Sequence, residues 1–137
     1  MSGHTRAAYE QRLNELRSLP IASAKRRALD VLRRWNVTRS RTDAPAESAQ
    51  ALGPVTREFF EQFREVRSPN DAHVIGTDLI APSQYIESLT AIGRSDYMDM
   101  AVRNGGDEIF VVDGSEDRDA LKPTYPSIYH LIIDFGD

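Results

Sequence analysis

The chain has 137 residues, a formal net charge of −4, 40% hydrophobic residues, 28% charged residues and no cysteine. This length suits a single domain over residues 1–137, which would bury roughly two-thirds of its unfolded surface. The lack of cysteine excludes disulfides, a thiolate nucleophile and a cysteine-based zinc site. The longest apolar run, Ile109–Val112, is too short to span a membrane, and no signal-peptide core follows the polar start. We therefore expect a cytoplasmic protein.

Charge is divided unequally between the two halves of the chain. Residues 1–70 contain 13 Lys and Arg against 8 Asp and Glu, a net charge of +5. Residues 71–137 contain 4 against 13, a net charge of −9, and the two values sum to −4. An acidic surface attracts a basic partner and orients it during encounter. The second half is therefore the first place to expect a binding surface.

Two helices are predicted at the start of the chain. Apolar residues recur at helical spacing from Tyr9 to Leu16, and Pro20 follows the end of this run. Ser23 can cap a second helix, whose apolar stripe ends at Trp35. Both helices are amphipathic and need a hydrophobic surface to pack on.

A polar stretch separates these helices from a third one. Residues 36–46 predict a loop, and residues 47–52 predict a short helix before Gly53-Pro54. From Thr56 a stronger helix begins. Its broad apolar face contains Phe59, Phe60, Phe63 and Val66. Because aromatic side chains bury large areas, this helix should lie at the centre of the core.

After Ser68-Pro69-Asn70 the pattern changes from helical to extended. Residues 74–76 and 79–81 predict short extended pieces. Ser83 can cap a helical turn that reaches Ile86.

A β-hairpin gives the clearest local pattern. Residues 98–103 alternate between apolar and polar, Asn104-Gly105-Gly106 tolerates a tight turn, and residues 108–113 return as a Val/Ile/Phe strand. A charged loop over 114–122 then leads to a predicted final strand over 127–133. Helices first and strands later predict the α+β class, with a mostly antiparallel curved sheet and flanking helices.

This order of segments resembles a known family. The segments are a Phe-rich helix over residues 56–63, Ile75-Gly76-Thr77-Asp78-Leu79-Ile80, Ala91-Ile92-Gly93, a strand over 107–113 and a closing segment over 125–131. Residues 52–133 resemble the bacterial branch of the SMI1/KNR4 (SUKH) superfamily, and residues 1–50 form a helical lead-in outside the resemblance. The tryptophan that many relatives carry among the strands is absent here. The resemblance implies an α+β domain that binds and blocks a toxin, often a nuclease, as an immunity protein, with no catalytic residues.

The acidic residues of the second half are the candidate contact residues. The full set comprises Asp96, Asp99, Asp107, Glu108, Asp113, Glu116, Asp117 and Asp119. We select as the predicted partner-binding site Asp96, Asp99, Asp113, Glu116, Asp117 and Asp119, with Tyr97 and Tyr125 as aromatic anchors; Tyr129 is a further candidate anchor. A nuclease binds phosphates through a basic surface. An acidic surface on this chain could bind that same basic surface and block the phosphates. The alternative is that each acidic residue is an ordinary solvated charge on the surface. Such charges also prevent exposed edge strands from pairing with other chains.

Several other kinds of site are disfavoured by spacing. The side-chain oxygens of Asp113, Ser115, Asp117 and Asp119 alternate as calcium ligands do, but a glycine at the sixth position and a glutamate at the twelfth are missing. Ser127, His130 and Asp134 are the residue types of a catalytic triad, yet on one predicted strand Ser127 and His130 fall on opposite faces. The basic stretch over residues 25–41 accompanies no nucleic-acid recognition motif. We therefore predict no metal, no cofactor, no catalytic residue and no direct contact with nucleic acid.

The sequence thus favours a non-enzymatic binding protein that neutralises a cognate toxin by masking its active site with an acidic surface. A regulatory adaptor or scaffold of the SMI1/KNR4 type is the alternative. A small hydrolase or ligand-binding domain is the third class, and a deep pocket with a carboxylate or histidine of shifted pKa would favour it. The identity of the toxin and the oligomeric state stay open.

Overall fold

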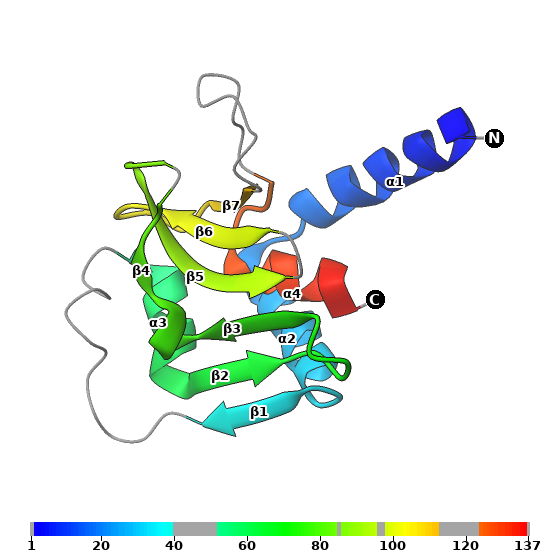
Figure 1. Cartoon of the computed structure of the whole chain (residues 1–137). Helices are drawn as coiled ribbons and strands as arrows, with labels where there is room; N and C mark the ends of the chain where they lie inside the picture. Colours follow the sequence, from blue (N-terminus) through cyan, green and yellow to red (C-terminus); the bar gives the residue numbers. More distant parts are fainter. Residues whose placement is uncertain (1, 40–51, 85, 96–97, 113–123, 137) are drawn as a thin grey trace.

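The computed structural model describes residues 2–39, 52–84, 86–95, 98–112 and 124–136, in which helices pack on one antiparallel sheet (Figure 1). The helices are α1 (Ser2–Arg17), α2 (Ile21–Leu32), α3 (Pro54–Gln62) and α4 (Ile128–Gly136), with a short 3-10 turn, η2 (Thr77–Leu79). The strands are β1 (Asn36–Arg39), β2 (Phe63–Arg67), β3 (His73–Gly76), β4 (Ala81–Pro82), β5 (Leu89–Ser95), β6 (Asp99–Arg103) and β7 (Ile109–Val112). The predicted α+β class is confirmed.

The sheet is a meander in the order β1-β2-β3-β5-β6-β7, and every pairing is antiparallel. β5 is the longest strand. Its second half pairs with β3, as in Ile75 opposite Gly93, and its first half pairs with β4, as in Ala81 opposite Ala91. The register with β6 shifts between Ala91 and Gly93, and β5 bends along its length in Figure 1. This bend curves the sheet.

The helices α2, α3 and α4 cover one face of the sheet (Figure 1). Strand residues such as Val66, Ile75 and Ile92 are fully buried on this inner face. Phe59 is at the centre of an aromatic cluster, with its ring centroid 5.3 Å from that of Phe60, 5.0 Å from that of Phe63 and 6.0 Å from that of Tyr129. The prediction that these phenylalanines form the centre of the core is confirmed.

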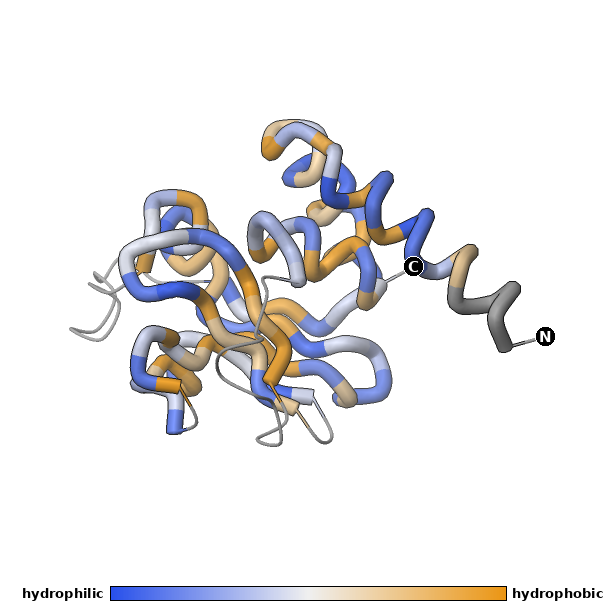
Figure 2. The backbone as a smooth tube through the Cα atoms, turned by 90° about the horizontal axis from the view of Figure 1, so that it is seen from above, coloured by the Kyte–Doolittle hydropathy of each residue, from blue (hydrophilic) through white to orange (hydrophobic). Residues whose placement is uncertain are grey.

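Helix α1 is the least embedded of the four helices. Its buried side chains are Leu13 and Leu16, near its C-terminal end, whereas Tyr9 is 47% exposed. In Figures 1 and 2 its N-terminal end extends outside the rest of the molecule. Among the described residues, no helix has both the length and the apolar character that a membrane crossing requires.

The largest correction concerns the end of the chain. Residues 127–133 were predicted as a strand but begin helix α4, which is buried all round from Ile128 to Ile133. A short run of Ile, Leu and Tyr has no polar face, so its period cannot distinguish a buried helix from a buried strand. Ser127, just before the helix, accepts a hydrogen bond from the backbone N–H of His130, as an N-cap does.

Two further predictions about the first half are wrong. The third helix ends at Gln62, and Phe63 already belongs to β2, which pairs with β1 and β3. Residues 36–39, predicted as loop, form β1 at one edge of the sheet. Pairing with neighbouring strands outweighs the local helical and loop preferences here. The predicted short helix over 47–52 lies, apart from Leu52, outside the described residues.

The predicted hairpin is confirmed. Strands β6 and β7 pair as expected, and Gly105 in the connecting turn has a φ of 74°, which favours glycine. The predicted helical turn after Ser83 is instead a local turn, in which the Ser83 hydroxyl accepts a hydrogen bond from the Ile86 N–H. The sequence did not assign β5, the strand that joins the two halves of the sheet.

Candidate protein-binding surface

The described residues that flank the predicted contact segments lie at one end of the sheet. Asp99 at the start of β6 lies opposite Val112 at the end of β7. The β5–β6 turn closes at the same place, because the Ser95 N–H donates to the carbonyl of Met98 at 2.8 Å. The described residues next to 96–97 and 113–123 in the sequence are therefore neighbours in the sheet. We call the described residues Arg94, Ser95, Met98, Asp99 and Val112 the hairpin end.

Most of the predicted contact residues belong to those two segments. Asp96, Tyr97, Asp113, Glu116, Asp117 and Asp119 lie outside the described residues. Asp99 is described and is half-buried, directly across from the exposed Arg94 of β5. Its position on the outer face of the sheet, opposite the helices, leaves its carboxylate on the molecular surface.

Met98 is a contact candidate that sequence reasoning missed. Alternation had placed it on the same apolar face as Met100 and Val102, which are fully buried. β6 begins only at Asp99, so Met98 lies in the turn and is 41% exposed. A flexible thioether next to the carboxylate of Asp99 suits a protein-binding surface, since methionine adapts to differently shaped partners. The sequence indicates only that Met98 lies at the strand boundary.

Tyr125 was predicted as an aromatic anchor, but it is buried and 2% exposed. Its hydroxyl donates to Asp134 at 2.5 Å, and Arg12 pairs with the same carboxylate at 2.6 Å. Burial, together with the hydrogen bond to Asp134, raises the pKa of Tyr125 far above its usual range. The backbone of Tyr125 also bonds to Ile109 in β7. Tyr125 therefore links α4, and through Asp134 also α1, to the edge of the sheet. Its ring is not accessible to a partner.

Tyr129 is also unavailable as an anchor. It is 1% exposed, and its hydroxyl donates to Glu58, which is also paired with Lys25. Burial, and then the charge of Glu58, raises the pKa of Tyr129.

Two other acids of the second half are used within the fold. Asp107 accepts hydrogen bonds from the N–H and hydroxyl of Thr56 at 2.8 and 3.0 Å, which caps the start of α3. Glu108 pairs with Arg103 at 3.1 Å across the hairpin. Among the described acids of the acidic set, this leaves Asp99 as the residue placed to meet a partner.

Ser127 and His130 are close together, contrary to the strand-based prediction, because they occupy the first turn of a helix. Their Oγ and Nδ1 atoms lie 2.6 Å apart, and Nε2 of His130 lies 3.0 Å from the carbonyl oxygen of Leu19. A carbonyl can only accept, so Nε2 carries the proton and the Ser127 hydroxyl donates to Nδ1. Both residues have 0% exposure, and burial lowers the pKa of His130. This pair holds the connection after α1 against α4 and cannot reach a substrate.

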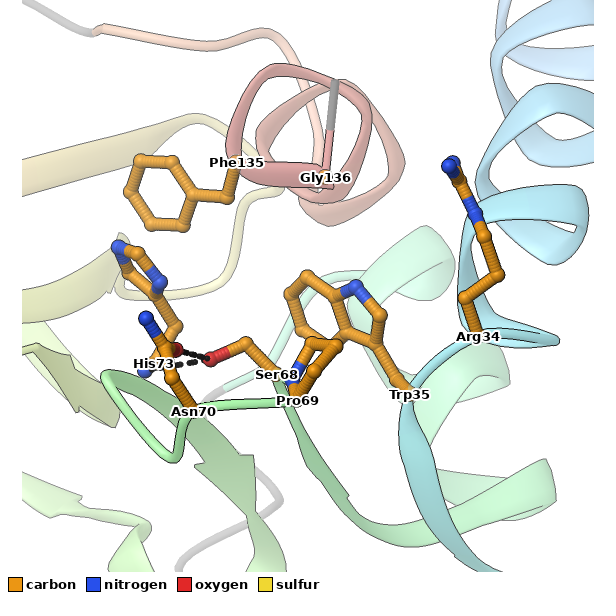
Figure 3. Close-up of a pocket in the computed structure, with 8 residues that line it drawn as sticks. All are labelled: Arg34, Trp35, Ser68, Pro69, Asn70, His73, Phe135 and Gly136. Atoms are coloured by element: carbon orange, nitrogen blue, oxygen red, sulfur yellow. Dashed lines mark hydrogen bonds between the residues drawn. The ribbon is translucent and has the colours of Figure 1, made fainter.

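A notch of about 330 Å³ lies near the ends of α2 and α4 (Figure 3). Figure 3 shows His73 and Phe135 on one side, with ring centroids 4.3 Å apart, and Trp35 and Arg34 on the other. The Ser68 hydroxyl donates to Asn70 and accepts from the His73 N–H, so it stabilises the β2–β3 turn. It is therefore not placed as a nucleophile.

In the part of the chain that the structure describes, no group of three His, Asp or Glu side chains could hold a metal ion. Arginines of the first half pair with two acids of the second half, through Arg12–Asp134 and Arg64–Asp78. No family model, curated protein or solved structure matches this chain. The likeness to the SMI1/KNR4 superfamily therefore stays a prediction.

Proposed function

We propose that this chain is a non-enzymatic binding protein that acts as an immunity protein and masks the basic active site of a toxin, such as a nuclease, with the hairpin end and the acidic residues that adjoin it in the sequence. The observation that carries this proposal is the exposed Met98 beside Asp99, at the end of the sheet whose described residues adjoin two acid-bearing segments in the sequence. An apolar contact next to a carboxylate, in an acid-rich part of the sequence, combines a desolvated anchor with charges that steer encounter.

The proposal that the chain is not an enzyme is supported by the use of its buried ionisable groups. His130, Tyr125 and Tyr129 have shifted pKa values, as catalytic groups often do. Each of them is closed off from solvent and hydrogen-bonded to another part of the chain. Their shifts follow from burial in the core, so the third class, a small hydrolase, has no support from them.

The experiment needs a defined partner, and the candidate to test is a toxin captured with this chain from its native cell and identified by mass spectrometry. Association and dissociation rates are measured for the natural chain and for a charge-reversed variant. The variant changes to lysine Asp99, Asp113, Glu116, Asp117 and Asp119. We expect association to slow by about tenfold or more at low salt and by much less at high salt, because salt screens steering. Met98→Ser should mainly speed dissociation.

The matched control reverses exposed acids elsewhere on the chain. Asp30→Lys with Asp78→Lys adds positive charge on α2 and after β3, away from the hairpin end. If the control slows association as much per charge as the hairpin-end variant, the proposed contact surface is wrong. Binding without protection of toxin-exposed cells would instead favour the alternative, a regulatory adaptor.

A further inference from the structure

We propose that a second surface, the groove between β1 and α2, binds an extended acidic segment of a partner protein, which adds to the sheet as a strand beside β1. This inference concerns a different surface from the hairpin end and does not depend on the proposed immunity function.

Strand β1 offers an edge for such an addition. It is the first strand in the sheet order, and its partner in the described part of the chain is β2. The opposite edge strand, β7, is covered in part, because Ile109 exchanges backbone hydrogen bonds with Tyr125. An edge strand presents backbone N–H and C=O groups that a peptide can pair with. Thr38 and Arg39 are exposed at this edge.

A groove of about 500 Å³ lies between this strand and α2. Only residues 33–35 connect α2 to β1, so the two elements diverge from this short connection. Buried Leu32, Trp35 and Phe63 contribute to the groove lining, together with the half-buried Leu29 and Val37. At roughly 3.3 Å per residue, the four residues of β1 match about four residues of an added strand. Alternate side chains of that strand would point into the groove.

The charges around the groove select an acidic occupant. Arg33, just after the end of α2, and Arg39 from β1 both line it. Arg39 lies over the ring of Phe63, with its guanidinium carbon 4.8 Å from the ring centroid. Arg33 is 81% exposed and pairs at 3.4 Å with Asp30, which is 69% exposed, so a carboxylate of a partner can replace this contact at little cost. Arg34, exposed in the connection after α2, adds to the positive potential.

Trp35 is the one tryptophan of the chain and lines the groove, so its fluorescence reports occupancy. The probe is the capped peptide Ac-EEVTVEE-NH2, compared with Ac-KKVTVKK-NH2. We expect the acidic peptide to change Trp35 emission saturably and to bind about tenfold or more tightly than the basic one, with an affinity that falls as salt rises.

Backbone pairing is tested on the peptide, so that the protein fold is untouched. Two versions of the acidic peptide are N-methylated, one at odd and one at even positions. Only every other residue of an added strand bonds to its neighbour, so one version should lose about tenfold or more in affinity and the other much less. If both versions bind as well as the parent peptide, strand addition is wrong.

Charge selection is tested on the protein. Arg33→Glu with Arg39→Glu should reverse the preference between the two peptides. The matched control is Arg26→Glu with Arg64→Glu, which changes the same number of exposed charges outside the groove lining. This control should still prefer the acidic peptide. Three results would overturn the proposal. The first is no fluorescence change up to about 1 mM acidic peptide, since a Kd above that value is very weak. The second is equal binding of both peptides, and the third is a dimer of the chain whose formation the acidic peptide inhibits. The last result would identify a second copy as the occupant.

Discussion

Polar side chains are used in opposite ways in two regions of this molecule. Around α4, the groups of Tyr125, Asp134, Ser127 and His130 are buried and bonded to α1, to the carbonyl of Leu19 or to one another. At the rims of the sheet, Asp99, Arg33 and Arg39 lie on the surface beside the accessible apolar groups of Met98 or of the β1–α2 groove. The first region contains the pKa values that burial shifts most, those of Tyr125, Tyr129 and His130, and the second contains the surfaces that another protein can reach.

This difference shows that a shifted pKa can result from burial alone and is not by itself evidence of a functional group. The same desolvation that tunes a catalytic group also acts on a structural one. Here the shifted groups connect segments that are far apart in the sequence, such as His130 with the carbonyl of Leu19 and Tyr129 with Glu58. We therefore expect substitutions around α4 to change stability, and substitutions at the rims to change binding.

Tyr125→Ala should produce the largest effect. It removes a buried ring, a hydrogen bond to Asp134 and part of the contact with α1, and we expect a loss of about 3–5 kcal/mol in the free energy of unfolding. Urea denaturation measures this loss. The control Tyr9→Ala, at a residue that is 47% exposed, should change stability by about 0.5 kcal/mol or less. Similar losses in both variants would contradict the division between the two regions.

Acidification should act on the same region through His130. Burial lowers its pKa in the folded chain, while the unfolded chain keeps the ordinary value of 6.5. Above pH 6.5 both states are neutral, and as the pH falls below 6.5 the unfolded state takes up a proton first. Stability should therefore fall toward lower pH, with a slope of at most about 1.4 kcal/mol per pH unit, until the folded-state pKa is reached.

The measurement is the urea midpoint between pH 7.5 and 5.5 for the natural chain and for His130→Gln. The variant should be less stable overall, since it disturbs the contacts with Ser127 and Leu19, but its stability should depend less on pH. An unchanged slope in His130→Gln would show that other groups cause the dependence.

Asp107 has a different role from the one that the sequence predicts. The sequence places it in the acidic surface, whereas in the structure it caps α3. Asp107→Ala should cost about 1 kcal/mol, because the N–H and hydroxyl of Thr56 lose their acceptor. Asp107→Asn keeps an acceptor and should recover most of that loss. Glu108→Ala, which removes an exposed pair with Arg103, serves as the control, with an expected loss of about 0.5 kcal/mol or less. Thermal unfolding can rank the three variants.

The sequence predicted the elements whose local chemistry is decisive. Gly105 and its neighbours specify the β6–β7 turn, and the three phenylalanines locate the core. It failed where tertiary contacts decide. β1 is polar and gains its strand structure from pairing with β2, and α4 is a buried helix without a polar face. The Ser127 cap was the one local indication of that helix.

The candidate site was predictable in part for a related reason. Composition located the acidic segments, and antiparallel pairing of Asp99 with Val112 explains why the described residues next to them are neighbours in the sheet. Composition could not show that Tyr125 is buried or that Asp107 is a cap, since both depend on residues distant in the sequence. Nor could alternation show that the strand begins after Met98.

The smallest effect on stability is expected at the hairpin end. Met98→Ser and Asp99→Lys should each change the free energy of unfolding by about 0.5 kcal/mol or less, since Met98 is 41% exposed and Asp99 is only half-buried. Urea denaturation run beside the binding assay checks this. Because the two variants fold normally in this prediction, any change in their rates with the toxin comes from the surface itself. A loss above about 1.5 kcal/mol in either variant would place that residue with the structural groups around α4 and remove it from the candidate surface.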